Sequence, residues 1–130
     1  MRLLLDTHVW LWMITGDERL TDTLRANLED PDSDVYLSAA AMWELAIKSA
    51  AGKLKYTGSP SVQIPIHIQR TGVYPLPVTV EHAIAAADLP MHHRDPFDRM
   101  MVAQAQIEEL TLATADRRLA AYEVSVLQVA

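Results

Sequence analysis

The sequence predicts an α/β fold, a three-layer α/β/α sandwich built around a mainly parallel sheet. Short apolar runs, typical of buried strands, alternate along the whole chain with longer segments of helical periodicity. Capping and helix-breaking residues stand between these segments and mark where helices begin and end. The length of 130 residues suits one compact core, so we expect residues 1–130 to form a single domain.

The N-terminal segment predicts a strand followed by two helices. Residues 2–5 form a short apolar run that ends at Asp6, as expected of a buried parallel strand. A helix follows from Thr7 and is broken at Gly16. Thr21 is a suitable N-cap for a second, exposed helix. Strand one therefore delivers Asp6 to its carboxyl end.

The central segment continues the alternation. Ser38 caps a helix, whereas Pro65 stands in the early turns of another and removes a backbone hydrogen bond there. The predicted elements of this segment are a strand over 35–37, a helix over 39–52, a helix over 61–70 and a strand over 73–76.

The C-terminal segment contains the clearest helix of the chain. Thr79 caps one helix, and Pro96 opens the next at a first helical position, where its missing N–H costs nothing. The predicted elements are a helix over 80–89, a helix over 96–110, a strand over 110–114, a short helix over 116–122 and a strand over 124–129.

The composition restricts both chemistry and location. Because there is no cysteine, the chain can form no disulfide, no thiolate zinc site and no cysteine nucleophile, which suits a reducing cytoplasm. The apolar N-terminus is interrupted at Asp6 and His8, and no stretch reaches the length of a membrane span. We expect a soluble, unprocessed, cytoplasmic protein.

The charge distribution bears on nucleic-acid binding. A net charge of −6 is unlike the basic surface of a general nucleic-acid binder. Basic residues nevertheless lie close in sequence to several acids, where they are consistent either with phosphate contacts or with a solvated surface. The candidates for contact with RNA phosphates are Arg94, Arg99, Arg117 and Arg118.

Acidic side chains gather at the predicted carboxyl ends of strands. Asp6 ends the first strand, and Ser38 ends the second and begins the helix that carries Glu44. Asp116 follows the strand over 110–114, and Asp98 lies in the first turn of its helix. Ligands of open parallel sheets bind outside these strand ends, so we expect the four acids to meet there.

Two of these acids lie on apolar faces of their helices. The residues at helical spacing are Met101, Val102 and Ala105 for Asp98, and Ala40, Ala41 and Ile47 for Glu44. Carboxylates buried together repel one another unless a cation or protons neutralise them. Hard oxygen ligands favour Mg²⁺ or Mn²⁺ over zinc, and such ions suit hydrolysis of phosphodiester bonds.

Four segments resemble, in order, the acidic motifs of PIN-domain ribonucleases, in particular the VapC-type toxins of type II toxin–antitoxin (VapBC) systems. The segments are LLLDTHVWLW, SAAAMWELAIKSAAGKL, HRDPFDRMMVAQA and LATADRRL. The resemblance implies a PIN-like fold, Mg²⁺ (or Mn²⁺) as cofactor, an RNA substrate, a homodimer and a cognate VapB-like antitoxin as partner.

The resemblance also assigns roles to residues of this chain. It implies that Asp6, Glu44, Asp98 and Asp116 are the catalytic and metal-binding acids, with Asp95 as an ambiguous fifth. The small polar residues that match supporting positions, where they would hold a ligand or water, are Thr7, Ser38 and Thr114.

Structural explanations for the same acids stay open. Three of them precede helices and can cap them, namely Asp6, Asp95 and Asp116. Asp98 can complete a capping box with Asp95, and Glu44 can pair with Lys48 at the i,i+4 spacing. A cap or an ion pair does not prevent the same carboxylate from binding a metal.

The histidine and tryptophan residues are compatible with functional roles, but their sequence context favours structural ones. His92 and His93 are adjacent in a polar loop and are expected to be solvated rather than to bind one ion. The tryptophans lie in apolar helices, which favours core or interface positions over base stacking; they are Trp10, Trp12 and Trp43. For a dimer, the region of Trp10 and Trp12 or the early helices is a candidate contact surface.

Other functions compete with the nuclease hypothesis. A phosphohydrolase of the haloacid-dehalogenase type would need an acid where His8 stands. A receiver-like signalling domain would need paired acids after strand one and a lysine at a strand end. A partner-binding domain, in which the acids only cap helices or bind a non-catalytic metal, is distinguished by an absence of metal-dependent cleavage.

Overall fold

The computed structural model describes residues 1–56 and 58–129. Within these residues five strands form one parallel sheet in the order β3-β2-β1-β4-β5. The strands are β1 (Arg2–Leu5), β2 (Asp34–Ser38), β3 (Tyr74–Leu76), β4 (Thr111–Thr114) and β5 (Val126–Gln128). The prediction of a mainly parallel sheet is confirmed.

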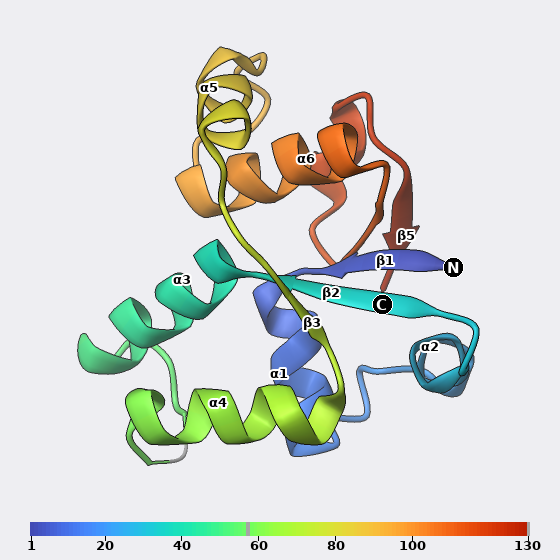
Figure 1. The fold of residues 1–130 in the computed structure, drawn as a ribbon, viewed down its shortest axis with the longest axis vertical. Helices are drawn as coiled ribbons and strands as arrows, with labels where there is room; N and C mark the ends of the chain where they lie inside the picture. The colour runs from blue at the N-terminus through green and yellow to red at the C-terminus, as the bar shows by residue number, and fades with distance from the viewer. Residues whose placement is uncertain (57, 130) are drawn as a thin grey trace.

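Helices cover both faces of the sheet. Figure 1 shows α1 and α4 on one face and α5 and α6 on the other, which confirms the predicted three-layer α/β/α arrangement. The helices of the described residues are α1 (Thr7–Thr15), α2 (Asp22–Glu29), α3 (Ala39–Ala50), α4 (Pro60–Thr71), α5 (Val80–Asp88), α6 (Pro96–Glu108) and the 3₁₀ helix η1 (Arg117–Ala121).

The core is centred on β1. Leu3, Leu4 and Leu5 are completely buried, as expected for a central strand with helices on both faces. Trp10 and Trp12, on α1, are only 1% and 8% exposed and pack in the same core. The hypothesis that these two tryptophans form a dimer contact surface is therefore wrong, because the chain itself covers them.

Several predicted element ends shift by a few residues. The helix expected to stop at Gly52 ends at Ala50, and Gly52 adopts a positive φ of 70° just beyond it. The segment expected as a short helix over 116–122 forms the 3₁₀ helix η1. Pro65 lies inside α4, where the helix continues because Pro65 and Ser61 are exposed and water can reach the freed carbonyl.

The strand order places a crevice at one end of the sheet. From β1 the chain builds outward on one side to β2 and β3, and on the other side to β4 and β5. Leu5 pairs with Ala113, and the N–H of Asp6 donates to the carbonyl of Ala113 at 2.9 Å. The carboxyl ends of β1 and β4 therefore open together at the point where connections diverge, which is where such sheets bind ligands.

No helix in the described part of the chain is both long enough and apolar enough to cross a membrane.

Candidate active site

A pocket of about 360 Å³ lies at the carboxyl ends of β1 and β4. The predicted convergence of the acids is found there, since Asp6, Glu44, Asp98 and Asp116 all line this pocket together with Asp95. Its remaining lining residues are His8, Trp12, Lys48, His93, Ala115 and Arg118.

Asp6 is buried and held by two donors. The hydroxyl of Thr114 donates to Oδ2 at 2.7 Å, and the backbone N–H of His8 donates to Oδ1 at 3.2 Å, so Asp6 also caps α1. Burial opposes ionisation of this carboxyl, but the contacts to His8 and Thr114 outweigh burial and lower its pKa below the ordinary value. Asp6 is thus an ionised carboxylate with a fixed orientation.

Glu44 reaches the pocket from the middle of α3 and is only 4% exposed. Its Oε1 accepts a hydrogen bond of 2.7 Å from the hydroxyl of Thr7, and its Oε2 accepts one of 2.6 Å from Nζ of Lys48. The predicted i,i+4 pair is confirmed. Of the residues expected on its apolar face, Ala40 and Ala41 are buried, whereas Ile47 is 43% exposed and that prediction is wrong because the end of α3 extends into solvent.

Asp95 acts as the N-cap of α6. Its Oδ1 accepts the backbone N–H groups of Phe97 at 2.8 Å and Asp98 at 3.2 Å. The predicted capping box is not closed, since the backbone N–H of Asp95 donates to His93 instead of to the Asp98 side chain. Asp98 is therefore free to direct its carboxylate into the pocket.

The pKa of Asp98 lies well above its ordinary value. Burial raises its pKa to about 7, and the charges of the neighbouring acids add to this effect. The residues expected on its apolar face, Met101, Val102 and Ala105, are all buried. A positive charge beside this carboxyl would favour the loss of its proton.

Asp116 follows β4 and caps η1. Its Oδ1 accepts the backbone N–H and Nε of Arg118, both at 3.0 Å, and its Oδ2 accepts Nη2 of Arg118 at 2.8 Å. Nε2 of His93 lies 3.0 Å from the same Oδ2. These donors, the Arg118 side chain foremost, hold the pKa of Asp116 well below its usual range.

His93 is the site residue that the sequence did not reveal. It was expected to be solvated, but it is only 7% exposed, and its ring lies between Asp98 and Asp116. The ring turns inward because its Nδ1 accepts the N–H of Asp95. His92, by contrast, is exposed as expected. The signal in the sequence is a histidine two residues before an Asp–Pro helix start, where it can accept the free amide of the cap.

Two of the three predicted supporting residues hold acids. Thr7 donates to Glu44, and Thr114 donates to Asp6 while accepting the N–H of Asp116 at 3.0 Å. Ser38 instead caps α3 through the N–H of Ala40 and does not line the pocket.

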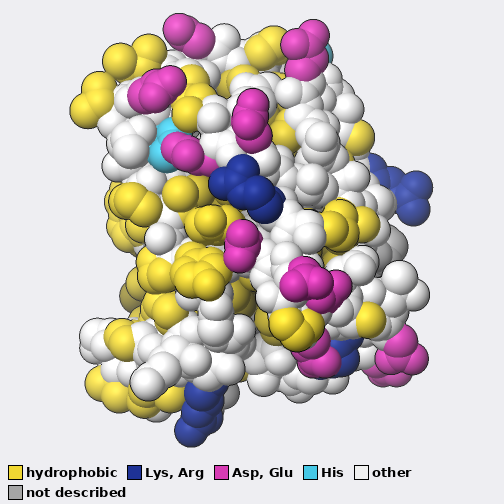
Figure 2. All heavy atoms as spheres, turned by 45° about the vertical axis from the view of Figure 1, so that its right-hand side comes forward, with side chains coloured by type: hydrophobic (Ala, Val, Ile, Leu, Met, Phe, Trp, Pro, Cys, Tyr) yellow, Lys and Arg dark blue, Asp and Glu magenta, His cyan; other side chains and the backbone are white. Residues whose placement is uncertain are grey.

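The four predicted phosphate-binding arginines have different surroundings. Arg94 and Arg117 are exposed, and Arg118 is exposed but paired with Asp116. Arg99 is only 7% exposed and donates to backbone carbonyls, among them Ala86 at 2.9 Å, so its assignment to phosphate binding is wrong. On the face drawn in Figure 2, the Lys and Arg side chains stand apart from one another rather than in a patch.

The charge balance of the pocket favours a bound cation. Among the described residues that line it, five carboxylates face two permanently charged bases, Lys48 and Arg118. Three groups are close enough for one ion, since ligand atoms of His93, Asp98 and Asp116 lie within 4.8 Å of one another. Carboxylate oxygens are the donors that Mg²⁺ and Mn²⁺ prefer, so the residues present fit such an ion.

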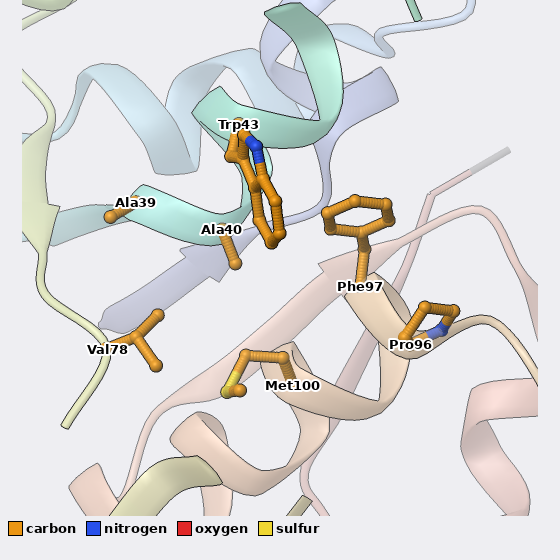
Figure 3. A pocket seen from close by; sticks show the side chains of 7 residues that line it. All are labelled: Ala39, Ala40, Trp43, Val78, Pro96, Phe97 and Met100. Atoms are coloured by element: carbon orange, nitrogen blue, oxygen red, sulfur yellow. The ribbon is translucent and has the colours of Figure 1, made fainter. Parts of the chain in front are cut away.

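An apolar pocket of about 430 Å³ adjoins this region between α3, α6 and the segment after β3. Figure 3 shows Trp43 and Phe97 side by side in its lining, and their rings meet edge to face with centroids 5.5 Å apart. Trp43 is 65% exposed and so lies outside the core. Its sequence neighbour is Glu44, and that of Phe97 is Asp98, so the two pockets are built by the same helices.

The PIN domain profile matches residues 3–124. A comparison of the sequence with curated proteins gives no match. The structure is similar to VapBC2 from Rickettsia felis bound to a promoter DNA fragment, with a TM-score of 0.75 and 16% identity over all of both chains.

Two further solved structures are similar over nearly their whole length. FitAcB from Neisseria gonorrhoeae has a TM-score of 0.68 and 26% identity, over 97% of this chain and 96% of that one. VapBC-5 from Mycobacterium tuberculosis, a member of the VapBC family of toxin–antitoxin systems, has a TM-score of 0.64 and 21% identity over 98% of each chain. Since the family profile covers almost the whole sequence, this chain belongs to the PIN-domain family.

Proposed function

We propose that this protein is a Mg²⁺- or Mn²⁺-dependent endoribonuclease that acts as the toxin of a VapBC-like toxin–antitoxin pair in the cytoplasm. The observation that carries the proposal is the convergence of five carboxylates from separate segments on one pocket, lined by Asp6, Glu44, Asp95, Asp98 and Asp116. Membership of the PIN-domain family supports it.

The metal ligands would be Asp6, Glu44, Asp98 and Asp116, with Asp95 serving as the helix cap. A divalent cation bound among them would supply an activated water and neutralise the charge that develops on the phosphate oxygens. The protein residues keep the carboxylates in place. Thr114 fixes Asp6, Thr7 fixes one oxygen of Glu44, and Lys48 balances the other.

The RNA strand would approach the open side of this pocket. Arg94 and Arg117 are exposed and adjoin Asp95 and Asp116 in sequence, which supports them as contacts for the phosphates that flank the cleaved bond. Arg118 would join them only by leaving Asp116, to which it is bound by two side-chain hydrogen bonds.

The test is cleavage of a fluorescent RNA in the presence and absence of Mg²⁺ or Mn²⁺. Wild type should cleave only with metal, and Asp6→Asn and Asp98→Asn should be inactive while remaining folded. Equal activity of all three proteins would reject the assignment. Folded proteins without any cleavage would favour the alternative of a receiver-like or partner-binding domain, in which the acids cap helices or bind a non-catalytic metal.

The partner would be a VapB-like antitoxin, as the similarity to VapBC and FitAcB structures supports. Expression of this chain should arrest growth, and co-expression of a small neighbouring gene product should relieve the arrest. An active nuclease whose expression is harmless would contradict the toxin role.

The protein would also form a homodimer through the apolar pocket that contains Trp43. The pocket lining is uncharged, comprising Ala39, Ala40, Trp43, Val78, Pro96, Phe97 and Met100. An uncharged surface would let two copies of a chain with net charge −6 meet without bringing like charges together at the contact. In light scattering, wild type should be a dimer and Trp43→Glu a monomer; a dimeric Trp43→Glu would contradict this interface. The control is Ile84→Glu, an exposed residue of α5 that does not line the pocket, and it should remain a dimer.

A further inference from the structure

We infer that His93 is a positioning residue of the acidic pocket, which donates its Nε2–H to Asp116 beside Asp98, and that it is not a ligand of the metal. This inference rests on the proposed function, because it concerns how the carboxylates of that site are held. A metal ligand and a hydrogen-bond donor would lie equally close to these carboxylates.

The position of His93 at first suggests a metal ligand. Its Nε2 lies 3.0 Å from Oδ2 of Asp116 and 3.2 Å from Oδ2 of Asp98, so one ion could touch all three groups. Imidazole nitrogen is a common ligand of Mn²⁺ and of softer divalent ions. Which role applies depends on whether Nε2 carries a lone pair or a hydrogen.

The other ring nitrogen decides the question. The backbone N–H of Asp95 donates to Nδ1 of His93 at 3.0 Å, so Nδ1 must present its lone pair. In a neutral imidazole the single ring hydrogen is then on Nε2, where it points at the carboxylates. A nitrogen that carries a hydrogen has no lone pair for a metal, and histidines that bind metals usually donate from their second nitrogen instead of accepting there.

The ring cannot readily exchange these roles, because the backbone around it is fixed. The N–H of His93 donates to the hydroxyl of Tyr122 at 3.0 Å, and its carbonyl accepts Nη1 of the buried Arg99 at 3.3 Å. The Asp95 amide begins α6, whose first turn is held by the Asp95 carboxylate. Turning the amide away from Nδ1 would therefore disturb the start of the helix.

The same arrangement occurs a second time, away from the acidic pocket. Nδ1 of the buried His82 accepts the N–H of Thr79 at 3.1 Å, and its Nε2 meets Oε1 of Glu108 at 2.9 Å. His82 does not line the acidic pocket. It therefore provides an internal reference for a histidine whose Nε2–H is donated to a carboxylate without any metal nearby.

The consequence for the site is a bridge between two acids. Asp116 is fixed on one side by Arg118 and on the other by His93, and Asp98 lies next to the same ring nitrogen. The partial positive charge of the N–H offsets repulsion between the two carboxylates. His93 would thereby keep them at a constant separation, as outer hydrogen-bond partners do for metal-binding side chains.

The first measurement is the tautomer of each histidine by long-range ¹H–¹⁵N NMR on the full chain, without metal and with saturating Mg²⁺. Signals are assigned by the loss of one histidine in His93→Gln and in His82→Gln. His93 should show hydrogen on Nε2 in both conditions, as His82 does. Hydrogen on Nδ1 of His93, before or after Mg²⁺ addition, would overturn the inference.

The second measurement is Mn²⁺ affinity by calorimetry for variants at this position. His93→Gln retains an N–H donor and should bind within about threefold of wild type, whereas His93→Ala should lose about tenfold or more. The exposed neighbour His92→Gln is the control, and thermal unfolding checks that each variant is folded.

The two measurements also separate this inference from the proposed function. If wild type takes up no Mn²⁺, the nuclease proposal fails while the tautomer still tests the role of His93. If wild type binds Mn²⁺ and His93→Ala binds it equally well, the inference alone fails.

Discussion

The hydroxyl of Thr114 donates a hydrogen bond of 2.7 Å to Asp6, a residue 108 positions away in the sequence. The same hydroxyl accepts the N–H of Asp116 at 3.0 Å. One completely buried side chain at the end of β4 therefore sets the relative position of two acids of the pocket. The pairing of β1 with β4 therefore determines how Asp6 and Asp116 lie relative to one another.

Replacing Thr114 by valine should remove the hydrogen-bond link between the two acids while hardly changing the volume of the side chain. Thr114→Val removes the donor to Asp6 and leaves the N–H of Asp116 without its acceptor, at an expected cost of about 1–3 kcal/mol in the free energy of unfolding. Affinity for Mn²⁺ should fall as well. Urea unfolding and calorimetry measure the two effects, with Thr111→Val at the other end of the same strand as the control. Unchanged metal affinity would show that this hydroxyl does not organise the pocket.

The raised pKa of Asp98 predicts how stability depends on pH without metal. Its folded pKa of about 7 lies above the ordinary 3.8, so between these values the folded state binds more protons than the unfolded state, and stability falls as pH rises. The Asp98→Asn side chain does not titrate, so above pH 7 the free energy of unfolding of this variant should exceed that of wild type by about 2–4 kcal/mol. Urea unfolding with EDTA at pH 5 and pH 8 measures the difference.

Two comparisons make the Asp98 prediction specific. Asp88→Asn, an exposed change at the end of α5, should give the same small effect at both pH values. Adding Mg²⁺ at pH 8 should stabilise wild type more than Asp98→Asn, because the cation replaces the proton. An advantage of Asp98→Asn that is as large at pH 5 as at pH 8 would refute the electrostatic explanation.

The fold and the acids follow from local sequence patterns. The apolar run before Asp6 predicts a buried strand, and Pro96 with its preceding Asp95 predicts the start of α6. A parallel sheet then brings Asp6 and Asp116 together, because β1 and β4 pair in register. Periodicity also placed Asp98 on a buried helix face, where its neighbours Met101 and Val102 are completely buried.

Contacts that depend on the direction of polar side chains could not be predicted. His93 lies in a polar loop and Arg99 on α6, and hydrophobic periodicity contains no information on which polar side chains turn inward. His93 is buried because a backbone amide binds its ring, and Arg99 because its guanidinium donates to carbonyls near the end of α5 and in the loop that follows. Trp43 is the opposite case, since an apolar helix position is left exposed beside a pocket.

Lys48 is expected to compete with the metal for Glu44. Its Nζ lies 2.6 Å from Oε2, so Lys48→Met leaves a buried carboxylate with less compensation. Without metal, the free energy of unfolding of Lys48→Met should lie about 1–3 kcal/mol below that of wild type. This variant should bind Mn²⁺ more tightly than wild type does, and Mn²⁺ should raise its stability by more. Thermal unfolding with and without Mn²⁺ tests this, and the exposed Lys53→Met should behave like wild type. Weaker Mn²⁺ binding by Lys48→Met would contradict it.

Arg99 is expected to act in stability rather than in RNA binding. Its guanidinium donates to the carbonyls of Ala86 and Leu89 at 2.9 Å and of Pro90 at 3.0 Å, and no lysine can replace this fork of donors. Arg99→Lys should cost about 3 kcal/mol or more in the free energy of unfolding, against almost nothing for the exposed Arg94→Lys. Similar unfolding curves for the two variants would mean that the carbonyl contacts are energetically unimportant.

Arg94 and Arg117 are the exposed cations expected to contact the RNA backbone. Each phosphate contact releases counterions, so removing one should reduce the slope of log affinity against log salt by about 0.7 for a single-stranded ligand. Binding of a fluorescent RNA is measured by anisotropy in the Asp6→Asn background, which avoids cleavage. Arg94→Met and Arg117→Met should each lower the slope, and Arg70→Met on α4, a basic residue outside the acidic pocket, should not. Equal slopes for all of these variants would place the RNA path elsewhere on the surface.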